Sequence, residues 1–409
     1  MLISSPDFPR RRDSRCTGNS LCDRCRADQQ FLRSRDRRPV TAGAALIRVA
    51  DLFCGCGGMS IGLAEAASRA GYRFEVALAA DSEPAAIRIY QSNLPKAEAR
   101  VARIEEIFEG AVGAPLTNSE NEIAGAVGPV DLLLGGPPCQ GHSDLNNHTR
   151  RRDPKNALYL RMARAAEVLA PKVVVIENVT PVQWDESGVL KATFEALIAS
   201  GYQAAGRVLD LRRVGVPQRR RRFVLIASRL ATVDPKNVLD HLADATPGHQ
   251  DRTVRWAIED LINCNLATVY DTASQTSKEN AKRIRFLFEK RLYDLPNENR
   301  PKCHRDRVHS YVSMYGRLHW NEPAQTITTG FGSMGQGRYV HPQRRRTITP
   351  HEAARLQTFP DWFDFGEKTP RGVIAQAIGN AVPPLLMLEL GNLVLPALSC
   401  PPDVERLQA

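Results

Sequence analysis

Residues 135–143 read Gly-Gly-Pro-Pro-Cys-Gln-Gly-His-Ser and directly follow an apolar run at 130–134. The apolar run predicts a buried strand. Two glycines and two prolines then require a sharp turn where the strand ends. Open α/β sheets bind ligands at the carboxyl ends of their strands, so this turn presents Cys139 at such an edge. We interpret Cys139 as a nucleophile rather than as the small core residue that most free cysteines are.

A second predicted strand, at 47–50, leads into a glycine-rich turn, Asp-Leu-Phe-Cys-Gly-Cys-Gly-Gly, and then into a helix. Gly55, Gly57 and Gly58 allow the backbone to approach a ligand closely at the switch point of a doubly wound sheet. No Gly-Lys-Ser/Thr follows, and the Gly-x-Gly-Gly spacing fits a dinucleotide fingerprint poorly. Phe53 in this turn is expected to pack its ring against an adenine.

Acidic residues end two further predicted strands. The strand at 74–80 ends at Asp81, which can accept both ribose hydroxyls of a nucleoside cofactor or cap the helix that Pro84 begins. The β-branched run at 172–176 is typical of a strand buried on both faces and ends at Glu177. A carboxylate at that depth is costly unless it is used, which makes Glu177 a candidate acid.

A basic segment at 218–222, Gln-Arg-Arg-Arg-Arg, runs into the apolar strand 223–227. Alternate side chains of an extended segment share a face, so Arg220 and Arg222 are expected to point together into the cleft. The alternative is a solvated charge run at the edge of the sheet.

These segments, in this order, resemble the motifs of the DNA (cytosine-5)-methyltransferases of bacterial restriction–modification systems, over about residues 46–397. The stretch 346–361 resembles the family's ninth motif and 379–384 its tenth. The resemblance implies an α/β methyltransferase fold, with a Rossmann-like doubly wound sheet and a smaller target-recognition domain. It also implies that the cofactor is S-adenosylmethionine.

The resemblance also implies a role for each candidate residue. Cys139 bonds covalently to C6 of a flipped-out cytosine, since the thiolate is the attacking form. Glu177 holds N3 and the exocyclic amine, while Arg222 and Arg220 bind the cytosine or its phosphate and orient Glu177. The residues expected to contact DNA are Gln140, Ser143 and Thr326. The cofactor residues are Phe53, Gly55, Gly57, Gly58, Asp81, Ser82, Ile104, Pro138, Asn380 and Val382. Ser82 stands where the family often has an aromatic residue, and Arg103 stands where it usually has Asp.

Composition and motifs together predict five segments. Residues 1–44 hold ten Arg and five Asp with few apolar residues, so we expect a basic, disordered arm. The catalytic domain is placed at 45–261 and the target-recognition domain at 262–342, with a helix at 277–292. Residues 343–397 are expected to pack back onto the catalytic domain, and 398–409 form a tail.

The net charge of +10 suits a polyanionic partner, which is expected to be double-stranded DNA, although RNA would suit equally. No apolar run of 18 residues occurs, so no membrane partner is expected. The arginine-rich N-terminus lacks the apolar stretch of a secretory signal. Nine cysteines, at least one of them needing a free thiol, favour a reducing cytoplasm, with the protein at the nucleoid. The resemblance implies a monomer and a cognate restriction endonuclease.

Alternatives stay open at the level of sequence. One is a tRNA cytosine-5 methyltransferase, another a non-catalytic DNA-binding homologue, and a third a methylase of free nucleotides. Cys16, Cys22 and Cys25 invite a zinc interpretation, but a structural site takes four ligands and no fourth lies nearby. We therefore expect no metal, and we interpret the pair Cys303-His304 as surface residues.

Overall fold

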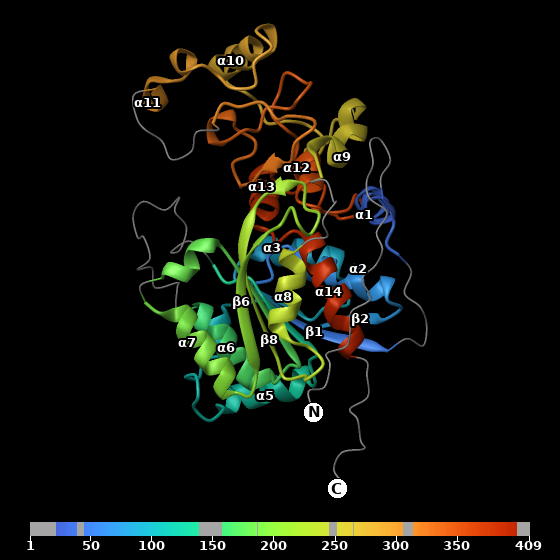
Figure 1. The fold of residues 1–409 in the computed structure, drawn as a ribbon, viewed down its shortest axis with the longest axis vertical. Coiled ribbons are helices and arrows are strands. Elements are labelled where there is room, and N and C mark those ends of the chain that lie inside the picture. The colour runs from blue at the N-terminus through green and yellow to red at the C-terminus, as the bar shows by residue number, and fades with distance from the viewer. Residues whose placement is uncertain are drawn as a thin grey trace.

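The computed structural model describes residues 22–38, 45–138, 158–185, 187–244, 252–264, 266–305 and 314–398 (Figure 1). The predicted nucleophile Cys139 and the predicted DNA contacts Gln140 and Ser143 lie outside the described residues. All other predicted site residues lie within them.

A seven-stranded sheet forms the centre of the protein, in the order β3-β2-β1-β4-β5-β8-β6. Neighbours from β3 to β5 pair in parallel, whereas β8 runs antiparallel to both β5 and β6. The predicted doubly wound α/β class is confirmed, with one reversed strand near an edge. The strands are β1 (Leu46–Leu52), β2 (Arg73–Asp81), β3 (Ala99–Val101), β4 (Leu132–Gly135), β5 (Val173–Asn178), β6 (Gln203–Asp210) and β8 (Arg221–Ser228).

Alternation along the strands divides the core between the two faces of the sheet. In β5, Val173 and Val175 belong to one apolar cluster, while Val174 and Ile176 belong to the other. A strand buried on both faces therefore reads as a continuous apolar run. The first face is covered by α2 (Gly58–Arg69), α8 (Pro235–Ala243) and α14 (Pro384–Leu398). The second is covered by α4 (Ile104–Ile107), α5 (Asn118–Val127), α6 (Leu158–Leu169) and α7 (Val189–Ala199).

A second region lies beyond one end of the sheet, where Figure 1 shows α10 and α11 farthest from it. It has its own small core, which includes Ile284, Leu287 and Tyr315. The predicted helix at 277–292 is observed as α10 (Lys278–Glu289), with Ser277 as its N-cap. A two-stranded parallel sheet of β7 (Gln218–Arg219) and β9 (Ala324–Gln325) ties this part of the chain to the basic segment.

The remaining helices connect these parts. They are α3 (Pro84–Asn93), η2 (Thr180–Trp184), α9 (Val254–Ile258), η3 (Glu259–Asn263), η4 (Asn297–Asn299), α11 (Lys302–Arg305), η5 (Met334–Gln336), α12 (Pro350–Leu356) and α13 (Arg371–Asn380). By length and composition alone the helical stretch Arg371–Leu398 could cross a membrane, but 67% of its most apolar window is buried within the protein. Because α14 packs closely on α2, this stretch belongs to the core.

Within the arm expected to be disordered at 1–44, the described residues 22–38 include a helix. Residues Asp23–Arg33 form α1, whose Phe31 and Leu32 are buried in the main core. Its Asp28 is fully buried between Arg69, at 3.0 Å, and Arg252, at 2.7 Å. Composition misled here because the charge of this segment is neutralised by side chains far away in the sequence.

Candidate active site

Three predicted site residues and one glycine of the turn before Cys139 directly follow paired residues of four neighbouring strands. Ala80 of β2 pairs with Leu52 of β1, Leu52 with Gly135 of β4, and Gly135 with Ile176 of β5. The next residues are Asp81, Phe53, Gly136 and Glu177. Since these strands are parallel, the acidic residues and both glycine turns meet at one carboxyl edge, as predicted.

The segment that leads to Cys139 lies against Glu177. A Cβ placed on Gly136 would be 4.0 Å from Oε2 of Glu177 and 4.0 Å from Val382. The side-chain amide of Asn178 donates to the carbonyl of Pro137 at 3.3 Å. Gly136 just after β4, Glu177 of β5 and Val382 just before α14 therefore lie close together. That Cys139 reaches these residues remains a prediction.

Glu177 forms an ion pair with Arg222, whose Nε lies 2.9 Å from Oε1 of the carboxylate. Both side chains are largely buried, at 10% and 15% exposure. The contact lacks hydrogen-bond alignment, so Oε1 has no hydrogen-bond partner among the described residues. The nearby hydroxyl of Tyr159 is also buried without a partner there, and burial followed by the charge of Glu177 raises the pKa of Tyr159. The carboxylate of Glu177 and the hydroxyl of Tyr159 can therefore each make a further hydrogen bond.

Arg220 binds different groups from Arg222. It is 2% exposed and donates to the carbonyls of Ile327, at 3.2 Å, and Ala381, at 3.1 Å. Residue 220 falls between β7 and β8, so the simple alternation expected of one continuous strand does not hold across 220–222. The two arginines thus make different contacts within the protein, and that both bind the cytosine or its phosphate remains a prediction.

Two buried glutamines, neither of them predicted as a site residue, extend the contacts of Arg220. Gln218 donates to Gln357 at 2.6 Å and accepts from the amide of Ile327 at 2.8 Å. Gln357 donates to the carbonyls of Ile378 and Ala381. Gln218 begins the basic segment at 218–222, and Gln357 lies in the stretch 346–361. Nothing in the sequence indicated that their side chains hydrogen-bond to each other.

The glycine turn is held by Asp81. One carboxylate oxygen accepts from the amide of Gly55 at 2.9 Å, and the other accepts from the amide of Glu83 at 2.9 Å. Burial raises the pKa of Asp81. The cap of α3 is Glu83, not Asp81, while Ser82 beside them is exposed. Asp81 therefore both ends its strand and orients the turn beside it.

The turn also packs tightly against the start of the last helix. Phe53 has a left-handed φ of 53° and Gly57 a φ of 97°. A Cβ on Gly58 would lie 2.3 Å from the carbonyl oxygen of Val382, a distance that real side chains do not tolerate. Among the remaining predicted cofactor residues, Ile104 is buried at the start of α4, and Asn380 is exposed at the end of α13.

Asp51 is a buried acid that was not predicted as a site residue. It is 1% exposed, and its Oδ2 accepts from Ser60 at 2.6 Å and from Tyr90 at 3.4 Å. Its Oδ1 has no partner within the part of the chain that the structure describes. Burial raises the pKa of Asp51 to about 7. An acidic residue between the apolar Val49-Ala50 and Leu52-Phe53 was the signal available in the sequence.

Comparison with known proteins shows to which family the chain belongs. The family model of C-5 cytosine-specific DNA methylases matches residues 47–394. The chain belongs to this family. The resemblance seen in the sequence is therefore confirmed, and the protein is a DNA cytosine-5 methylase.

The methylase has relatives of similar length. It is 44% identical to the type II methyltransferase M1.BsuMI of Bacillus subtilis, over 87% of this chain and 82% of that protein. It is 30% identical to the type II methylase M.HgiDII of Herpetosiphon aurantiacus, over 82% of this chain and 91% of that protein. The Dnmt2 methyltransferase of S. pombe shares the fold, with a TM-score of 0.58, 17% identity, and coverage of 87% of this chain and 100% of that one.

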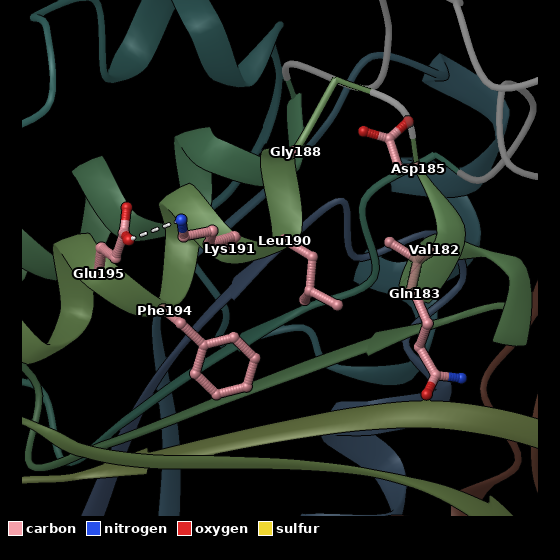
Figure 2. Close-up of a pocket in the computed structure, with 8 residues that line it drawn as sticks. All are labelled: Val182, Gln183, Asp185, Gly188, Leu190, Lys191, Phe194 and Glu195. Carbon is pink, nitrogen blue, oxygen red and sulfur yellow. Dashed lines mark ion pairs between the residues drawn. The ribbon is translucent and has the colours of Figure 1, made fainter.

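A cavity of about 390 Å³ in this methylase lies between η2 and α7. Figure 2 shows Phe194 and Leu190 of α7 pointing toward Val182 and Gln183, with the ion pair of Lys191 and Glu195 to one side. None of the predicted catalytic or cofactor residues lines it. This cavity is therefore separate from the predicted cytosine and cofactor residues.

Proposed function

We propose that this methylase transfers a methyl group from S-adenosylmethionine to C5 of a flipped-out cytosine, in a specific sequence of duplex DNA, through a covalent bond between Cys139 and C6. The observation that carries this proposal is the shared edge on which Gly136, Glu177, Arg222 and Val382 lie close together. Cys139 follows Gly136 by three residues, within reach of that edge.

Features of the glycine turn fit S-adenosylmethionine. The buried Oδ1 of Asp51, which has no partner among the described residues, would suit a cationic group of the cofactor. With a pKa of about 7, a substantial fraction of Asp51 is ionised at neutral pH. Beside Gly55 a Cβ would meet nothing within 4 Å, so the turn faces open space. Phe53, Asp81 and Val382 would surround the adenosine. When bound, this cofactor supplies an electrophilic methyl group.

The chemistry proposed for the protein side chains follows the electrons. The thiolate of Cys139 adds to C6, and the electron pair of the C5–C6 double bond becomes available at C5 to attack the methyl group. The bond from that methyl group to the cofactor sulfur would break, with its electron pair left on the sulfur as a neutral thioether. Glu177 holds N3 and the exocyclic amine, so a proton at its carboxyl group compensates the charge that builds in the ring. Arg222 fixes the carboxylate through their ion pair. A base then removes the C5 proton, the double bond re-forms, and Cys139 leaves C6.

The substrate must reach this edge as an extruded base, because C5 and C6 are not accessible to these groups within a stacked duplex. We propose that residues 262–342 recognise the DNA sequence and that Gln140, Ser143 and Thr326 contact the DNA. Thr326 donates to the carbonyl of Arg219 at 3.1 Å, so a contact there would be linked to the basic segment. The net charge of +10 supports a polyanionic substrate.

A place in a restriction–modification system is part of the proposal. Its support is that the relatives from Bacillus subtilis and Herpetosiphon aurantiacus are type II enzymes. We propose that a cognate endonuclease cuts the same sequence, and that the methylase acts as a monomer in the cytoplasm.

Bisulfite sequencing of plasmid and host DNA tests the reaction, in a methylation-free strain that expresses the wild type, Cys139→Ala or Glu177→Gln. We expect one short sequence to be methylated by the wild type alone. Absence of methylcytosine from DNA, with soluble protein that binds the cofactor, would contradict the proposal. Bisulfite sequencing of tRNA from the same cells would then detect an RNA methyltransferase, whereas unmethylated DNA and RNA would favour a non-catalytic homologue.

A further inference from the structure

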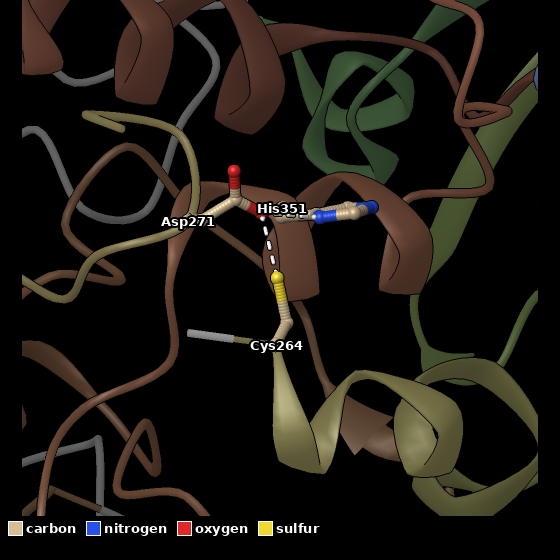
Figure 3. A group of neighbouring side chains, drawn as sticks. All are labelled: Cys264, Asp271 and His351. Carbon is tan, nitrogen blue, oxygen red and sulfur yellow. Dashed lines mark hydrogen bonds and ion pairs between the residues drawn. The ribbon is translucent and has the colours of Figure 1, made fainter. Parts of the chain in front are cut away.

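A cluster of three metal-binding side chains lies away from the proposed active site (Figure 3). Sγ of Cys264, Oδ1 of Asp271 and Nδ1 of His351 come from separate segments, and potential ligand atoms of the three residues lie within 4.8 Å of one another. The thiol is 3.4 Å from Oδ1, and the imidazole nitrogen is 2.8 Å from the same oxygen. The cluster lies where the chain leaves the predicted catalytic region, against α12.

The surroundings already orient these side chains as a metal site requires. The other ring nitrogen of His351 lies 2.9 Å from Asp361, whose carboxylate is held by Arg355. Metal-binding histidines usually direct their second nitrogen to such a carboxylate. The second carboxylate oxygen of Asp271, Oδ2, accepts a hydrogen bond from the hydroxyl of Thr268 at 2.6 Å.

Two distances between ligand atoms of the cluster are close to those of a zinc site. Zinc bonds of about 2.3 Å to sulfur and about 2.0 Å to nitrogen or oxygen, in a tetrahedron, separate neighbouring ligand atoms by about 3.3 to 3.6 Å. The observed distance of 3.4 Å between Sγ of Cys264 and Oδ1 of Asp271 already has this length. The distance of 2.8 Å between Oδ1 and Nδ1 of His351 would need to lengthen by roughly half an ångström.

The protons of the cluster also match a divalent ion. Oδ1 of Asp271 faces two hydrogen-bond donors, the thiol of Cys264 and a protonated ring nitrogen of His351. A zinc ion that displaces these two protons leaves the total charge of the cluster unchanged, and metal binding to thiol and imidazole releases protons in this way. A mixture of thiolate, imidazole and carboxylate favours zinc over magnesium or calcium.

We propose that Cys264, Asp271 and His351 bind one zinc ion through three protein ligands, with solvent as the fourth. The ion would link Cys264 and Asp271 to α12 through His351. This proposal is independent of the methylation reaction, and its test uses metal binding rather than activity.

The experiment uses the full-length protein, stripped with a chelator and then titrated with zinc sulfate in a calorimeter. We expect about one zinc per chain and about two protons released per zinc, measured from the dependence of the heat on the buffer. Cobalt(II) added in place of zinc should give a thiolate-to-cobalt charge-transfer band. Cys264→Ser should abolish that band and lower zinc affinity by roughly a hundredfold or more, because loss of a ligand exceeds the effect of losing an outer partner.

Two matched cysteine variants make the result specific. Cys303→Ser removes an exposed cysteine outside the cluster and should leave zinc binding unchanged. Cys22→Ser tests the N-terminal cysteines and should also have no effect. Cys264→Ser keeps a hydroxyl that can donate to Asp271, so this variant should keep its fold, which thermal unfolding checks. Failure of the wild type to bind zinc, wild-type binding by Cys264→Ser, or loss of binding in Cys22→Ser alone would overturn the proposal.

Discussion

The guanidinium of Arg222 and the carboxylate of Glu177 form a largely buried ion pair across β8 and β5, with 2.9 Å between Nε and Oε1. The two strands run antiparallel, and Asn178 pairs with Phe223, so Arg222 stands just beyond the last paired residue of β5. A buried carboxylate whose partner is removed becomes an uncompensated charge. The position of Glu177 therefore depends on Arg222.

Replacing this arginine should impair catalysis more than cofactor binding. We expect Arg222→Lys to lower kcat by roughly tenfold to a hundredfold, since lysine keeps the charge but loses the planar fork. Affinity for S-adenosylmethionine, measured by calorimetry, should stay within about twofold. Arg229→Ala is the matched control, because Arg229 follows the opposite end of β8 and stacks on Tyr202. Equal loss of activity in both variants would contradict a specific role for Arg222.

Gly58 should be intolerant of any side chain. Its Cβ would lie 2.3 Å from the carbonyl oxygen of Val382, so Gly58→Ala must push the turn away from the start of α14. We expect at least tenfold weaker binding of S-adenosylmethionine, measured by calorimetry. Gly372→Ala provides the comparison, because a Cβ there meets nothing within 4 Å and alanine favours a helix. Unchanged cofactor affinity in Gly58→Ala would refute this expectation.

Asp51 should make the free protein less stable as the pH rises. Burial raises its pKa to about 7 in the folded protein, whereas an unfolded Asp titrates near about 4. Between these values the folded state holds the proton and the unfolded state does not, so the free energy of unfolding falls as the pH increases from about 4 to about 7. In Asp51→Asn this contribution should be absent. Urea unfolding of both proteins at several pH values measures the difference, and parallel pH profiles would contradict the assignment.

Asp28 should behave in the opposite sense. Burial alone raises its pKa, but Arg252 and Arg69 outweigh burial and lower it below the ordinary value. Its stabilising contribution is therefore complete above about pH 4 and is lost as the pH falls through the folded pKa. We expect Asp28→Asn to cost about 3 kcal/mol or more of unfolding free energy at pH 7, and less in acid.

The control for this prediction lies on the same helix. Asp23 is 92% exposed in its ion pair with Arg26, so Asp23→Asn should change unfolding by no more than about 0.5 kcal/mol. Urea unfolding at pH 7 provides both values. A similar small effect in Asp28→Asn would mean that α1 contributes little to the folded core.

Much of the proposed site could be predicted because strand ends are marked in the sequence. Apolar runs fixed the positions of β1, β2, β4 and β5, and parallel pairing then placed Asp81, Phe53, Gly136 and Glu177 at one edge. These inferences need only local patterns and the rule that parallel strands share their carboxyl ends.

Contacts between distant polar side chains could not be predicted in this way. Arg220 bonds to carbonyls more than a hundred residues away, and Asp28 pairs with an arginine from another part of the chain. A residue's own neighbours do not reveal such partners. The helix α1 was missed for the same reason, because its polar composition indicates disorder until its buried partners are known.

The bonds that Gln218 and Arg220 make to Ile327 have a consequence for engineering chimeric enzymes. The stretch that ends the predicted recognition region is hydrogen-bonded to the catalytic part through its backbone, where β9 also pairs with β7. A recognition segment transplanted from a relative should therefore end before Ala324, so that the host keeps its own residues from 324 onward. A junction placed later would exchange a strand of the host enzyme together with its specificity.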